Sequence, residues 1–112
     1  MSDQHTPVWE LLGITGSEPG LLRLTNGVLS FKTEQGTRFS APVSALTDVK
    51  WPWYSFNCAL NLTVNGEKFR LSFARPNGAM AAWIPEEALG GVFALGGAMK
   101  TGKAWRAALE GR

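Results

Sequence analysis

Cysteine and histidine are nearly missing from this chain. Its 112 residues include one of each, Cys58 and His5. A single cysteine excludes an internal disulfide and fits a reducing, cytoplasmic setting. Metal sites need several ligands of these residue types. We therefore expect no metal and no other cofactor.

The residues that would build a catalytic site are missing as well. His5 lies in a polar stretch near the start of the chain, where a general base would not be held within hydrogen-bond reach of a target. Cys58 has no histidine nearby to activate it and is expected to be a small buried hydrophobe. The glycine-rich stretch 90–97 is not followed, at the required spacing, by the Gly-Lys-Ser/Thr of a phosphate-binding loop, and Met99-Lys100-Thr101 resembles that motif only faintly. We therefore expect a protein that is not an enzyme.

Long hydrophobic runs and strong charge of one sign are also lacking. A membrane-spanning helix needs about 20 apolar residues, whereas the nearest candidate, 79–99, is interrupted by Pro85, Glu86 and Glu87. The first residues lack the charged-then-apolar pattern of a secretion signal. The net charge of +2 is far from the concentrated positive charge of nucleic-acid-binding domains. These absences predict a soluble chain with no transmembrane segment and no nucleic-acid partner.

What the sequence does have is a regular alternation of apolar and polar residues. It runs from Leu21 to Phe73 and is punctuated by Asn26-Gly27, 34–36 and Asn65-Gly66. Asn-Gly between alternating runs is the strongest short signal for a β-hairpin. Short strands spaced about ten residues apart indicate a sandwich or barrel. The expected core consists of the apolar residues of these strands and of the last helix: Leu22, Leu24, Leu29, Phe31, Phe39, Leu60, Leu62, Phe69, Leu71, Phe73, Trp105 and Leu109.

Helices are expected toward both ends of the chain. Residues 6–13 fit a short helix with Thr6 as its N-cap. Residues 101–109 fit a second helix whose apolar face carries Trp105. The stretch 79–84 fits either a seventh strand or a short helix, and the structure of residues 79–99 stays open. The fold class predicted is mainly β, with six to seven antiparallel strands and a C-terminal helix in a single domain, residues 1–112.

The first part of the alternating region resembles a known family. Residues 20–31, Gly-Leu-Leu-Arg-Leu-Thr-Asn-Gly-Val-Leu-Ser-Phe, resemble the opening of GRAM and bacterial PH-like domains, and residues 39–49 and 67–73 resemble later strands of that pattern. This resemblance to the pleckstrin-homology superfold implies an antiparallel β roll or barrel closed by a helix. It also implies a binding module for lipids or proteins, although a fold by itself does not determine function.

The resemblance bears on lipid binding as well. Lipid-binding PH domains place several basic residues in and around a long first hairpin loop. In this sequence we take Thr25-Asn26-Gly27 to be that loop. A loop so short predicts that any binding to lipid headgroups is weak and sensitive to salt.

An aromatic loop is the first candidate binding surface. Residues 51–57 carry Trp53, Tyr54 and Phe56 where a polar turn is expected. Aromatic side chains anchor interfaces because they bury much area at little entropic cost. The three could instead cap the end of the barrel. Trp51 is expected to face the core, because it follows the parity of its strand.

A basic face is the second candidate. Strand parity places Arg23, Lys32, Arg38 and Lys50 on the outer face of the first sheet. Such a stripe could meet anionic lipid headgroups, or it could be a solvated face that prevents edge pairing.

These patterns favour a small, non-enzymatic binding or adaptor module. Its expected partner is a protein, a second copy of the chain, or an anionic membrane surface. The alternative function is that of a carrier for a small apolar ligand. A carrier would need a pocket larger than about 300 Å³ lined by tryptophan and phenylalanine.

Overall fold

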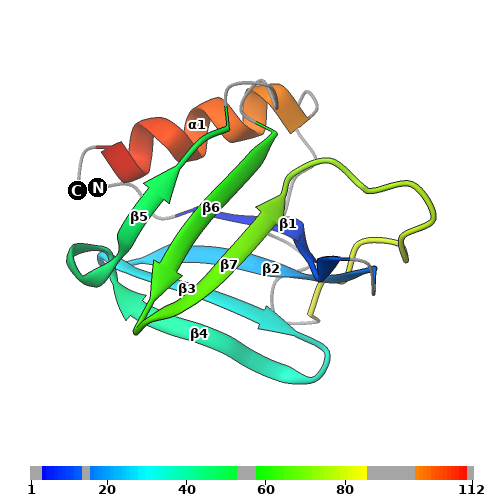
Figure 1. Cartoon of the computed structure of the whole chain (residues 1–112), viewed down its shortest axis with the longest axis horizontal. Helices are drawn as coiled ribbons and strands as arrows, with labels where there is room; N and C mark the ends of the chain where they lie inside the picture. Colours follow the sequence, from blue (N-terminus) through cyan, green and yellow to red (C-terminus); the bar gives the residue numbers. More distant parts are fainter. Residues whose placement is uncertain (1–3, 14–15, 53–57, 86–97, 111–112) are drawn as a thin grey trace.

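Seven antiparallel strands and a C-terminal α-helix make up the computed structural model, which describes residues 4–13, 16–52, 58–85 and 98–110 (Figure 1). The strands form one sheet in the order β4-β3-β2-β1-β7-β6-β5. This confirms the predicted mainly β class. The elements in chain order are β1 (Gln4–Leu11), β2 (Ser17–Thr25), β3 (Val28–Thr33), β4 (Gly36–Pro42), the 3₁₀ turn η2 (Val43–Ala45), β5 (Thr47–Lys50), β6 (Ala59–Val64), β7 (Glu67–Ser72) and α1 (Ala98–Glu110).

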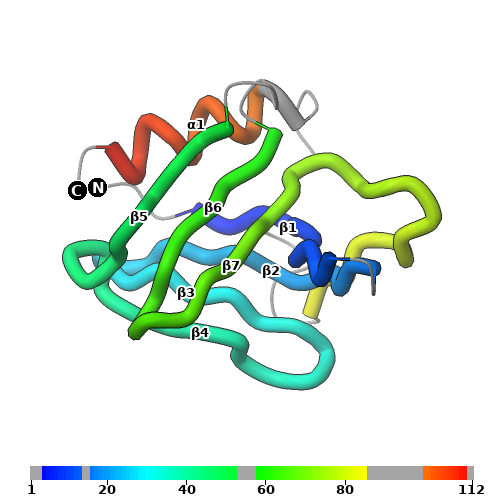
Figure 2. Tube along the Cα trace, in the orientation of Figure 1, coloured from blue at the N-terminus to red at the C-terminus, as the bar shows by residue number. Residues whose placement is uncertain are grey.

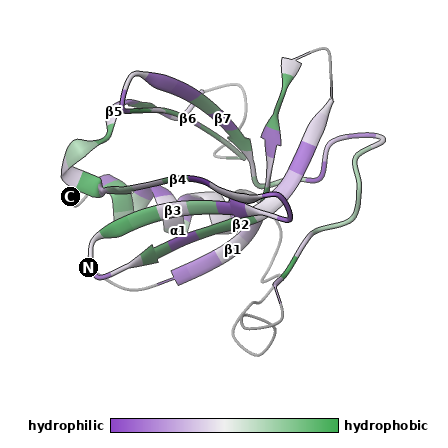
Figure 3. Ribbon diagram, turned by 90° about the horizontal axis from the view of Figure 1, so that it is seen from below, coloured by the Kyte–Doolittle hydropathy of each residue, from purple (hydrophilic) through white to green (hydrophobic). Residues whose placement is uncertain are grey.

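The sheet folds over on itself at β1. This strand pairs with β2 along its whole length, from Gln4 opposite Leu24 to Leu11 opposite Ser17. It pairs with β7 only at Trp9 and Glu10. The half containing β2 to β4 therefore diverges from the half containing β5 to β7, and the two halves face each other (Figure 3). Their apolar faces enclose the core, as expected for a sheet with one polar side.

Every residue predicted to form the core is buried. Leu22, Leu29, Phe31 and Leu60 are fully enclosed, and Trp105 is 1% exposed. Two alternating faces of a bent sheet can bury such a set without any long hydrophobic run, because only every second residue is apolar.

The helix α1 lies across one end of the folded sheet, beside the ends of β5 and β6 (Figure 1). The Trp105 ring stacks on Phe73 with centroids 6.5 Å apart, and Phe73 stacks on Trp51 at 6.0 Å. The indole Nε1 of Trp105 donates a hydrogen bond to Oγ1 of Thr6 at 3.1 Å. The predicted apolar face of this helix is confirmed, but the helix spans Ala98–Glu110 and so begins three residues before the predicted start at residue 101.

Both Asn-Gly pairs form hairpin turns, as predicted. Asn26 and Gly27 have φ of 52° and 76°, and Asn65 and Gly66 have φ of 51° and 84°. Two successive residues with positive φ are typical of a type I′ turn, whose twist matches that of the flanking strands. These turns connect β2 to β3 and β6 to β7.

The prediction of a helix over residues 6–13 is wrong, because Gln4–Leu11 is the strand β1. The sequence of β1 does not show the apolar–polar alternation of a strand, because both faces of β1 are covered near its end. The adjacent residues Trp9 and Glu10 are both buried. Residues 17–20 belong to β2, which begins four residues before the alternation visible from Leu21. The first hairpin therefore joins β1 to β2, and 25–27 is the second turn. The loop 25–27 is therefore not the first hairpin loop, as the sequence suggested, and weak, salt-sensitive headgroup binding stays a prediction.

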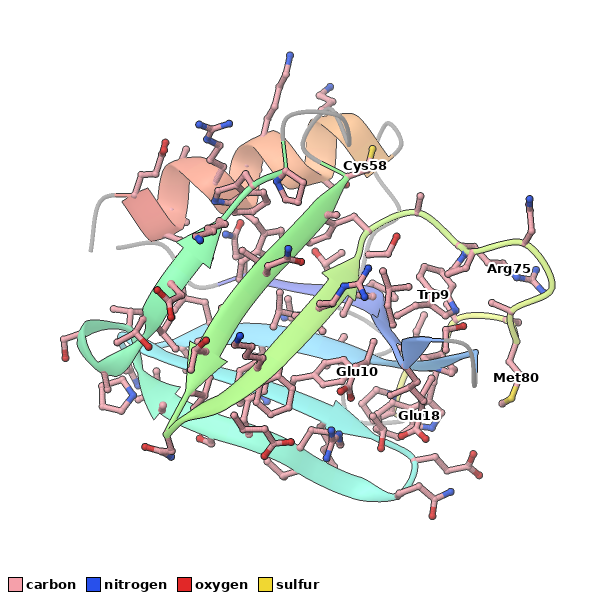
Figure 4. All side chains as sticks on the ribbon, in the orientation of Figure 1. Trp9, Glu10, Glu18, Cys58, Arg75 and Met80 are labelled. Carbon is pink, nitrogen blue, oxygen red and sulfur yellow. The ribbon has the colours of Figure 1, made fainter. Side chains whose placement is uncertain are left out.

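Residues 79–85 are neither strand nor helix in the structure. They follow a segment that extends away from β7 and returns toward the outer side of β1 and β2 (Figure 2). The indole Nε1 of Trp9 donates a hydrogen bond to the carbonyl of Met80 at 2.9 Å, and the two residues lie close together in Figure 4. This contact explains why an aromatic residue is buried on the outer face of the sheet.

Candidate functional site

The predicted aromatic loop falls outside the described residues. Trp53, Tyr54 and Phe56 lie in the range 53–57, for which the structure gives no description. The neighbouring Trp51 is described and packs against the core, as its parity predicted. The proposal that the three loop aromatics meet a partner stays a prediction.

The predicted basic face is divided by the topology of the sheet. Arg23 on β2 and Lys32 on β3 are both exposed, and neighbouring strands carry them on the same outer face. Lys50 is also exposed, but it lies on β5 at the opposite edge of the sheet. The parity of separate strands could not reveal this, because parity does not give the order in which strands lie beside one another.

Arg38 departs from the predicted face for a local reason. Phe31 of β3 is opposite Phe39 of β4, but the next residue, Lys32, is opposite Thr37. Arg38 is therefore an extra residue on β4, the signature of a β-bulge. A bulge redirects side chains, and here the side chain of Arg38 reaches toward the inner side of the sheet instead of the outer face.

There the guanidinium of Arg38 binds the carboxylate of Glu10. Nε donates to Oε1 at 2.8 Å and Nη2 donates to Oε2 at 2.9 Å, so the pair is bidentate. The Glu10 side chain is 6% exposed and lies between the two halves of the sheet (Figure 4). Arg38 also lies 5.3 Å above the Phe69 ring and 3.6 Å from Glu67. The hydrogen bonds to Glu10 raise the pKa of Arg38, and the nearby carboxylates of Glu67 and Glu18 act in the same direction.

A different set of basic residues comes together on the outer face of β5, β6 and β7. Asn61 of β6 is directly opposite both Lys50 of β5 and Arg70 of β7, and Thr63 of β6 is opposite Lys68 of β7. Directly paired residues of neighbouring strands point to the same face. We call the resulting depression the basic hollow: it has a volume of about 300 Å³, and its lining includes Asp48, Lys50, Asn61, Thr63, Lys68 and Arg70.

The charges of the basic hollow are not neutralised within the described ranges. Lys50, Lys68 and Arg70 are all exposed, and none of them forms an ion pair with a described residue. Asp48 is the one acidic residue in the lining. Lys68 and Arg70 were missed as site residues, although their alternation with Phe69 placed both on one face. The sequence alone could not show that Lys50 lies near Lys68 and Arg70, on the other side of β6.

A second hollow of about 220 Å³ lies between the start of β2, the β3–β4 turn and the segment 80–83. Its lining includes Glu18, Glu34, Met80 and Trp83. Neither glutamate forms an ion pair within the described part of the chain. The two hollows thus carry opposite charge.

No group of three or more histidine, cysteine, aspartate or glutamate side chains is placed to hold a metal ion in the described ranges. Within those ranges, too, no helix has the length and apolar character needed to cross a bilayer. Cys58 is half-buried just before β6.

Comparison of the sequence with protein-family models and with curated proteins finds no match.

Proposed function

We propose that this chain is a non-enzymatic binding module, built on a pleckstrin-homology-like roll, that binds an anionic partner through the basic hollow. The single observation that carries the proposal is the gathering of Lys50, Lys68 and Arg70 on one outer sheet face, where none of them forms an ion pair with a described residue. The bent sheet of seven antiparallel strands and its C-terminal helix support the resemblance to the superfold at the level of architecture.

The physical basis is electrostatic. Three cations around one carboxylate give the hollow a local excess of positive charge, although the chain as a whole is only weakly basic. None of the three cations forms an ion pair with a described residue, so no ion pair among the described residues is broken when an anion binds. Such binding is weakened by salt, because exposed charges are screened over about 10 Å at 0.1 M ionic strength.

The alternative, a carrier of a small apolar ligand, gains no support from the two hollows. The basic hollow is lined mainly by polar and charged side chains, and the second hollow carries two glutamates beside Trp83. The space between the halves of the sheet is occupied by the buried core.

The test compares two variants with the same loss of charge. Lys50, Lys68 and Arg70 are changed together to Gln in the first, and Arg23, Lys32 and Lys103 in the second. Lys103 is an exposed residue of α1, so the second variant alters other surfaces. Binding to immobilised polyglutamate and to vesicles containing anionic lipid is measured at low and high salt. We expect the first variant to lose binding and the second to retain it. Equal loss in both variants would contradict the proposal, because it would mean that only net charge matters.

A further inference from the structure

We propose that the occupant of the basic hollow is an extended acidic peptide segment whose carboxylates recur at every second residue. This inference rests on the proposed function, because it specifies the partner of the same surface. Lys68 and Arg70 are two residues apart on β7 and share its outer face. Alternate residues of a strand are about 7 Å apart. An extended peptide lying along β7 repeats its own side chains at the same distance, so two carboxylates at i and i+2 match the two cations.

The third cation widens the site across the sheet. Asn61 separates Lys50 from Arg70, and neighbouring strands lie about 4.8 Å apart, so the two basic residues originate about 10 Å from each other. A peptide is broad enough to contact both sides of such a site. Asn61 and Thr63 lie between the cations, where an amide and a hydroxyl are able to bond the peptide backbone. The Asp48 carboxylate, at the β5 side of the hollow, is able to accept hydrogen bonds from backbone N–H groups of the peptide.

A bilayer surface fits the hollow less well than a peptide. Binding to a membrane surface grows with apolar area inserted beside the charges. The large apolar side chains exposed among the described residues are Leu12, Val28 and Met80, and none of them lines the basic hollow. The hollow is therefore suited to a ligand that enters it, and charge complementarity selects an acidic one.

The experiment uses two fluorescent peptides of equal length, composition and charge in a serine- and threonine-rich background. In one, three glutamates occupy every second position, and in the other they occupy every third. Successive glutamates share one face of an extended chain only in the first peptide. Affinity for the whole chain is measured by fluorescence anisotropy at low salt.

We expect the every-second peptide to bind at least about fivefold more tightly than the every-third peptide. Each single change of Lys50, Lys68 or Arg70 to Gln should weaken its binding about two- to fivefold, the range of exposed ion pairs. The matched variant of Arg23, Lys32 and Lys103 should bind as the parent does. Equal affinity for the two peptides would overturn the inference.

Anionic vesicles separate the failure of this inference from that of the proposed function. If vesicles bind through Lys50, Lys68 and Arg70 while neither peptide binds, the peptide inference is overturned and the proposed function stands. If neither peptides nor vesicles bind, both are overturned.

Discussion

Replacing Arg38 by Met is the sharpest test of how the two halves of this sheet are held together. Methionine keeps an aliphatic side chain beside the Phe69 ring but removes both hydrogen bonds to Glu10. The carboxylate of Glu10, 6% exposed, would then be left without its partner. Breaking a buried ion pair by removing one member costs about 3–5 kcal/mol. The Arg38 side chain is 37% exposed, so water reaches it. We therefore expect the free energy of unfolding to fall by about 2–3 kcal/mol, at or below the lower limit of that range.

Such a loss is a large part of the stability of a small domain, which is about 5–15 kcal/mol. The free energy of unfolding is measured by urea titration followed through tryptophan fluorescence, since Trp105 is 1% exposed and reports on unfolding. Melting should fall by about 10 °C. The double variant with Glu10→Leu and Arg38→Met should be markedly more stable than Arg38→Met alone, because no buried charge remains without a partner.

An internal control is available on α1. Arg106 pairs with Glu110 at 3.2 Å on an exposed helical face. Arg106→Met should cost less than about 0.5 kcal/mol, as exposed pairs four residues apart contribute little. If Arg38→Met cost no more than this control, or if the effects at Glu10 and Arg38 were additive, the reasoning about the buried pair would be refuted.

The difference in unfolding free energy between the parent and Arg38→Met should depend on pH in one direction only. The pKa of Arg38 is raised in the folded chain by its hydrogen bonds to Glu10. A raised pKa of a basic group adds stability that is fully present below the pKa of the unfolded chain and is lost only as pH rises through the folded value. Because guanidinium groups stay charged in proteins, the stability difference between the parent and Arg38→Met should not decline between about pH 6 and pH 10.

The remaining predictions concern the core, the sheet and the aromatic loop. Trp105→Ala should lower the free energy of unfolding by about 3–5 kcal/mol in the same titration, and a stable variant would contradict its place in the core. Gly20→Ala should cost about 1–3 kcal/mol, since an added Cβ would lie 2.6 Å from the carbonyl oxygen of Lys32; an unchanged midpoint would argue against that close approach. Changing Trp53, Tyr54 and Phe56 together to Ser should abolish association, measured by sedimentation, and leave the melting temperature within a few degrees. A steep fall in the melting temperature would instead indicate that the loop caps the barrel.

Much of the fold was predictable because its signals are local. The strands from Leu21 to Phe73 alternate with a period of two, and their turns carry Asn-Gly at positions where both residues have positive φ. These features depend on neighbours a few residues away. The residues predicted to form the core are buried for the same reason.

The predictions that were wrong concern features that depend on contacts between segments far apart in the sequence. β1 is covered on both sides, by the core and by the segment that includes Met80, so its alternation is lost at Trp9 and Glu10. The bulge at Arg38 is set by how β4 meets β3, and it changed the face of one predicted site residue. Lys50 joined Lys68 and Arg70 because β6 lies between their strands. No local pattern carries this information.

The central position of β1 has a consequence for synthesis of the chain on the ribosome. β1 is made early, but its pairing with β7 must wait until residues 71–72 have emerged, and the bond from Trp105 to Thr6 spans 99 positions. Contacts between such distant positions slow folding. The hairpin of β2 and β3 is able to form as it emerges, whereas the two halves of the sheet can close only after β7 has emerged. Until then the apolar inner faces of both halves are exposed, and this is the interval in which the nascent chain is most open to aggregation or to chaperones.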